Sequence, residues 1–131
     1  MKYMLLLRDG NDDGPPAADT PEGAELFAAW RPVLQAMREE GVLIDCAPLT
    51  GVAAATTVRV RNGDTLITDG PAAELKEQVG GYTLIEVAGL DEALEWAARI
   101  PTAAVGSVEV RPVIDTGARA PMSGDATAAA R

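Results

Sequence analysis

The sequence predicts an α+β fold in which two strand–helix–strand units flank a β-hairpin. Three observations predict it: short apolar runs that end at Gly or Pro, two longer segments with apolar residues every three to four positions, and one Asn-Gly pair between alternating runs. The 131 residues fit one domain, and 47% hydrophobic against 24% charged residues is a globular balance. A core of this size can form without disulfides or a metal.

The first unit is expected in residues 1–48. An apolar strand in residues 1–8 is followed by a polar loop and by a helix that Thr20 can cap and Gly41 can end. A second strand follows in residues 42–48, where Cys46 is expected to be a small core residue rather than a reactive thiol. The helix should bury one face, which consists of Leu26, Phe27, Trp30, Leu34 and Met37.

The hairpin is expected in residues 57–68. Asn62-Gly63 suits a two-residue type I′ turn, because both of its central positions need a positive φ. Pairing outward from this turn gives one mostly apolar and one mostly polar face. The expected pairs are Arg61 with Asp64, Val60 with Thr65, Arg59 with Leu66, and Val58 with Ile67.

The second unit consists of a strand in residues 82–87, a helix between Gly89 and Pro101, and a last strand in residues 107–113. Residues 116–131 lack periodicity and predict a flexible or disordered tail, so the domain should span residues 1–115. The element order predicts a ferredoxin-like split βαβ sandwich with an inserted β-hairpin and both helices on one face of an antiparallel sheet. The second helix should bury Leu90, Ala93, Leu94, Ala97 and Ile100.

The first strand is apolar on both faces, with Tyr3, Leu5 and Leu7 on one side and Met4 and Leu6 on the other. Two helices on one side of the sheet can cover only one of these faces. The chain is too short to supply another layer, so we expect a homodimer in which two sheets face each other across a cleft.

Alternation also predicts what lines this cleft. Tyr82, Glu86, Glu109 and Arg111 are expected on the uncovered face, because the residues between them form the apolar alternative. An apolar lining with a few converging polar groups suits a small, anionic ligand, and Asp69 at the end of a strand is a further candidate. The simpler interpretation is an ion pair between Arg111 and an acid at the rim of a dimer interface.

Several functional classes are excluded by composition. The formal charge of −9 disfavours nucleic acid, and the absence of histidine rules out a Ser-His-Asp triad and a His-ligated metal. No run approaches the roughly 18 apolar residues of a membrane span, so we expect no membrane contact and a cytoplasmic location. The glycines lack the spacing of a phosphate loop, and no cofactor is expected.

Two further sets of residues suggest a metal site and a catalytic site. Asp9, Asn11 and Asp13 match the opening of a calcium loop, but Thr20 stands at the twelfth position, so a solvent loop without metal is expected. A lyase or isomerase without a cofactor could use Asp69 or Glu86 as base and Arg111 or Lys76 to stabilise an oxyanion.

Several segments, taken in order, resemble the DGPF branch of the YCII-related domain family over about residues 1–113. They are residues 69–77, the triplet Gly80-Gly81-Tyr82, residues 90–97, Pro101 and residues 108–112. The resemblance implies a dimeric α+β barrel of ferredoxin-like subunits and, through an association with sigma-factor regulation, a regulatory or sensing module with a protein partner. Ala72 and Leu75 depart from the motif's phenylalanine and threonine, and the histidine of enzymatic YciI-like relatives is absent.

Overall fold

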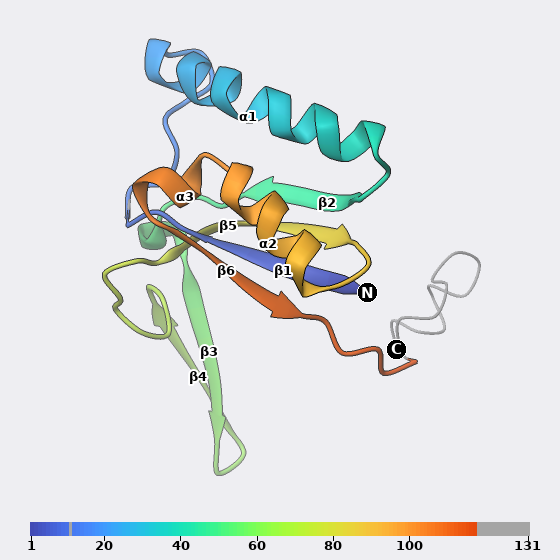
Figure 1. Cartoon of the computed structure of the whole chain (residues 1–131). Coiled ribbons are helices and arrows are strands. Elements are labelled where there is room, and N and C mark those ends of the chain that lie inside the picture. The colour runs from blue at the N-terminus through green and yellow to red at the C-terminus, as the bar shows by residue number, and fades with distance from the viewer. Residues whose placement is uncertain (11, 118–131) are drawn as a thin grey trace, which may run out of the picture.

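The computed structural model describes residues 1–10 and 12–117, and it has the expected mixed α+β architecture. The main sheet is antiparallel with strand order β2-β5-β1-β6, and β3 and β4 form a separate two-stranded sheet. Figure 1 shows α1 and α2 on one side of the main sheet and the β3–β4 hairpin projecting on the other. The elements are β1 (Lys2–Arg8), α1 (Pro21–Glu39), β2 (Leu43–Pro48), a 3-10 turn η1 (Val52–Ala54), β3 (Thr56–Arg61), β4 (Asp64–Asp69), β5 (Val79–Glu86), α2 (Leu90–Arg99), α3 (Thr102–Val105) and β6 (Ser107–Pro112).

Local sequence signals set the ends of α1. The Thr20 side chain accepts a hydrogen bond from the Gly23 backbone N–H at 3.1 Å, and Pro21 occupies the first helical position. Gly41 follows the helix with φ +72°, a conformation in which glycine avoids the strain of a side chain. The helix continues through Pro32.

The helical faces differ in part from those predicted. In α1 the buried residues are Gly23, Val33 and Met37, whereas Phe27 is 59% exposed. In α2 Trp96 is buried and Leu90 and Leu94 are exposed. Each helix contacts the sheet with a narrow stripe, so spacing alone placed the edges of that stripe wrongly.

One hydrophobic core lies between the helices and the main sheet. Tyr3, Leu5 and Leu7 of β1 point into it, and the residues between them lie on the other face, as alternation predicted. Leu5 is completely buried. Other members of the core are Val33, Met37, Val42, Ile85, Val87, Ala93, Trp96, Ala97 and Ile100.

The hairpin register agrees with all four predicted pairs, among them Val58 with Ile67 and Arg61 with Asp64. Asn62 and Gly63 have φ values of +53° and +80°, which fit the predicted type I′ turn. Register was therefore determined locally, by the turn residues and the alternation beside them.

Part of two sequence predictions lies outside the described residues: most of the tail, 118–131, and Asn11 of the acidic loop. Within residues 1–10 and 12–117, no helix is long and apolar enough to cross a membrane.

Candidate functional site

The face of the main sheet opposite the helices, called here the free face, is where the sequence placed its candidate residues. Directly paired residues of antiparallel strands share a face. Met4 pairs with both Leu84 and Arg111, and this places all three on the free face. By the same rule this face consists of Lys2, Met4, Leu6 and Arg8 of β1, Tyr82, Leu84 and Glu86 of β5, Ser107, Glu109 and Arg111 of β6, and Asp45 and Ala47 of β2.

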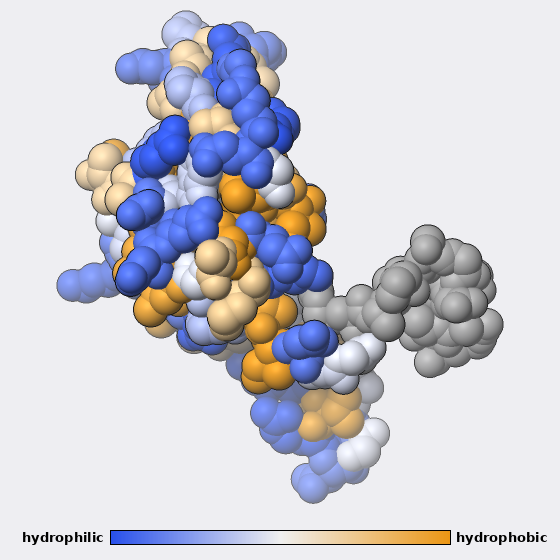
Figure 2. Space-filling view, turned by 45° about the vertical axis from the view of Figure 1, so that its right-hand side comes forward, coloured by the Kyte–Doolittle hydropathy of each residue, from blue (hydrophilic) through white to orange (hydrophobic). Residues whose placement is uncertain are grey.

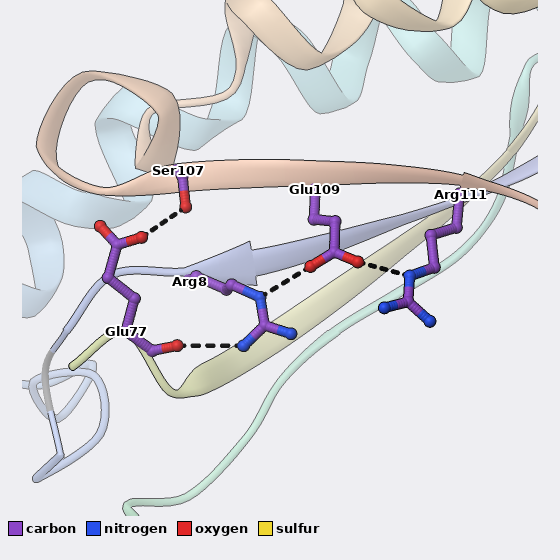
Figure 3. Close-up of polar contacts among 5 residues, drawn as sticks. All are labelled: Arg8, Glu77, Ser107, Glu109 and Arg111. Atoms are coloured by element: carbon purple, nitrogen blue, oxygen red, sulfur yellow. Dashed lines mark hydrogen bonds and ion pairs between the residues drawn. The ribbon is translucent and has the colours of Figure 1, made fainter. Parts of the chain in front are cut away.

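Two arginines share one carboxylate on this face. The Nε of Arg8 donates to Oε1 of Glu109 at 3.0 Å, and the Nε of Arg111 donates to the other oxygen, Oε2. Figure 3 shows Glu109 between the two guanidinium groups. Arg111 and Glu109 are two residues apart on β6, so their side chains project from the same face. This arrangement is called the Arg8–Glu109–Arg111 cluster below.

The cluster is tied to the connection that leads into β5. The Nη1 of Arg8 donates to the backbone oxygen of Glu77 at 3.0 Å, and the Ser107 hydroxyl donates to Oε1 of Glu77 at 2.7 Å. Arg8 is thus held by the Glu109 carboxylate on one side and by the Glu77 backbone on the other, and its side chain is only 20% exposed. Arg8 is therefore a positioned cation rather than a freely moving one.

The electrostatics of the cluster keep its acid ionised. Hydrogen bonds from Arg111 and from Arg8 lower the pKa of Glu109 below its ordinary value of 4.5. Glu109 therefore carries a negative charge at neutral pH and neutralises one of the two arginines, leaving the cluster with one net positive charge.

Arg111 presents the free part of that charge to solvent. Its side chain is 67% exposed, and only its Nε is engaged by Glu109. In Figure 3 its two Nη atoms point away from Glu109. Paired guanidinium N–H groups match the spacing of carboxylate or phosphate oxygens. The cluster can therefore bind an oxyanion through Arg111 while Arg8 stays fixed.

Tyr82 lies on the same face beside β2. Its hydroxyl donates to Oδ2 of Asp45 at 2.6 Å. This hydrogen bond, followed by burial and the Asp45 charge, raises the pKa of Tyr82 above 10.0. The phenol therefore stays protonated at neutral pH and is held by Asp45.

The other predicted candidates are dispersed. Glu86 is on the free face, but it lies at the end of β5, 4.0 Å from the amino group of Met1. Asp69 ends β4 in the separate hairpin sheet, and Lys76 is exposed in the connection before β5. Within the described residues, no group of three or more acidic or cysteine side chains could hold a metal ion.

Cys46 is half-buried in β2. Its Sγ lies 3.3 Å from the Thr83 hydroxyl, and Thr83 is completely buried. Cys46 is not among the core residues, so the predicted core position is wrong: the cysteine lies at the edge of the core, beside Thr83.

Sequence reasoning missed Arg8 and the docking of Glu77. Arg8 follows Met4 and Leu6 at intervals of two, so strand alternation could have placed it on the free face. Glu77 gave no such signal, because it lies in an irregular connection whose path is determined by tertiary contacts.

Comparison with protein-family models identifies the family. The sequence model of the YCII-related domain family matches residues 1–117. An uncharacterized protein of Rhizobium meliloti (strain 1021) is 47% identical over 77 residues, which cover 57% of this chain and 62% of that protein. The matched part therefore spans less than two thirds of the relative.

Proposed function

Because the chain belongs to the YCII-related domain family, we propose that it is a homodimeric binding module whose two copies pair their free faces and hold a small anion between them. Its similarity to the Rhizobium meliloti protein gives no information on activity, because that protein is uncharacterized. The proposal therefore depends on the chemistry of the free face.

The topology supports the pairing of two sheets. The strand order β2-β5-β1-β6, with both helices on one face, is the order of a ferredoxin-like split βαβ sandwich. Two such sheets placed face to face make a dimeric α+β barrel. We also place the chain in the DGPF branch, on the basis of Asp69-Gly70-Pro71 and the segments that follow it.

One observation carries the binding role: two arginines converge on a single glutamate, on a chain whose formal charge is −9. A local positive charge in an acidic protein attracts anions to one place and repels them elsewhere. Within residues 1–10 and 12–117, no hydrogen bond or ion pair engages the Nη atoms of Arg111, which leaves these donors for an anion.

The lining favours an anion with an apolar body. Met4, Leu6 and Leu84 lie beside the cluster on the free face, and Leu84 is only 8% exposed. A carboxylate or phosphate bound to Arg111 would place the rest of a small molecule against these side chains. In a sensing module, the bound anion would signal to a regulatory protein partner.

The alternative, a lyase or isomerase, has weaker support. Its base and its cation should lie together, but Asp69 ends β4 in the hairpin sheet and Lys76 lies in the connection before β5. Glu86 is on the free face, where its ion pair is with the amino group of Met1 rather than with Arg111. Glu109, with its lowered pKa, suits a counter-ion better than a proton donor near neutral pH.

A thermal-shift experiment tests the binding role, with acetate, benzoate and inorganic phosphate as probes. At least one probe should raise the melting temperature of the wild-type protein, and Arg111→Ala should abolish that increase. Arg31→Ala is the matched control, because Arg31 is exposed on α1, on the helix side of the sheet. An increase that persists in Arg111→Ala, or none with any probe, would refute the proposed anion site.

A further inference from the structure

The β3–β4 hairpin has an apolar face that no other described part of the chain covers. Val58, Val60 and Ile67 lie on this face, since Val58 pairs with Ile67 and Val60 is two residues further along β3. Their exposed fractions are 59%, 59% and 66%. Scattered exposed apolar residues are ordinary, but three aliphatic side chains together on a projecting ribbon indicate a contact surface.

The chain itself holds the opposite face of the hairpin. The Thr57 hydroxyl donates to the Gly70 backbone oxygen at 2.7 Å, and Nη2 of Arg59 donates to the Ala72 oxygen at 3.1 Å. The connection after β4 therefore packs along the polar face, and the apolar face is turned away from it. A two-stranded hairpin is marginally stable alone in water, so it gains from burial of its other face.

The hairpin stands on the side of the main sheet where the free face lies. Figure 1 shows it projecting away from α1 and α2. In Figure 2 the same projection, at the bottom of the view, carries hydrophobic residues among hydrophilic ones. A second copy seated on the free face would therefore come within reach of the hairpin.

A second copy suits this surface better than the remaining chain does. Residues 118–131 contain no Val, Ile, Leu or aromatic residue, so they offer little to pack against aliphatic side chains. Val58, Val60, Thr65 and Ile67 are uncharged, and Asp69, which pairs with Thr56 at the end of the hairpin away from its turn, is the acidic residue on this face. The part of the face that carries the three aliphatic side chains therefore adds no repulsion between two chains of charge −9. Two-fold symmetry would give each hairpin an equivalent place on the other copy.

From these observations we infer that the hairpin is an arm that packs Val58, Val60 and Ile67 against a second copy of this chain. The inference rests on the proposed homodimer and deepens it: the arms extend the contact beyond the free faces.

Sedimentation over a dilution series tests the arm, with Val58→Thr and Ile67→Thr introduced together. Threonine is also β-branched and both positions are exposed, so the hairpin should still form. The dimer dissociation constant should rise about 100-fold, which is about 2.8 kcal/mol at 1.4 kcal/mol per tenfold. The matched control joins Leu94→Gln and Val105→Thr, two exposed apolar residues on helices, and should leave the constant unchanged.

The outcomes separate the arm from the dimer. A dimer whose dissociation constant does not change in the hairpin variant would overturn the arm and leave the paired free faces standing. Equal weakening by the hairpin and control variants would also overturn it. A wild-type protein that stays monomeric at every concentration would refute the proposed dimer and the arm together. Melting curves of each variant confirm that it is folded.

Discussion

Two neighbouring leucines of β1 give opposite predictions, because they lie on opposite faces of the main sheet. Leu5 is completely buried in the core, and Leu6 is half-buried on the free face. Leu5→Ala leaves a cavity that costs about 3–4 kcal/mol of unfolding free energy, within the usual range for buried leucines. Leu6→Ala removes fewer packed contacts and should cost an isolated chain about 1 kcal/mol.

Urea unfolding followed by circular dichroism measures both effects. With a slope of about 2 kcal/mol per molar urea, Leu5→Ala should lower the midpoint by about 1.5–2 M at every protein concentration. Leu6→Ala should lower it by about 0.5 M in dilute protein, and by more at concentrations where the wild-type dimer forms, because the dimer buries this side chain. Equal losses in dilute protein would refute the assignment of the two faces.

Three further predictions concern single contacts. Thr20→Ala removes the cap of α1 and should cost about 1 kcal/mol of unfolding free energy, which lowers the urea midpoint by about 0.5 M; an unchanged midpoint would mean that the cap is replaced by water. The lowered pKa of Glu109 means that its stabilisation is complete above the ordinary value of 4.5 and is lost as the pH falls through the folded-state pKa. Acid unfolding of Glu109→Gln should lack this component, and an identical pH profile would contradict the cluster. Gly106→Ala would bring a Cβ into collision with the Arg8 backbone oxygen, so the melting temperature should fall markedly; a wild-type value would show that the turn at Gly106 can move away from β1.

Patterns that depend on near neighbours were predicted well. The hairpin register follows from Asn62-Gly63 and the alternation on either side of it. The placement of Arg111 on the free face follows from the period of two in β6. In both cases the pattern repeats every two residues along the chain, so the prediction depends little on how distant elements pack.

Features that depend on how elements pack were predicted less well. Phe27 was expected in the core and is exposed, while Trp96 is buried and was not expected there. Their burial depends on which sector of each helix meets the sheet, and helical spacing does not specify this. The ion pair between Arg8 and Glu109 joins residues 101 positions apart. Its prediction would have required knowing that β1 and β6 are neighbours in the sheet.

The mass of the protein in solution tests the central claim, that two copies pair through their free faces, most directly. Static light scattering at micromolar concentration should give twice the mass of the 131-residue chain, and Leu6→Asp should shift the mass toward that of one chain. The mass of a single chain for the wild-type protein at every concentration would contradict the claim.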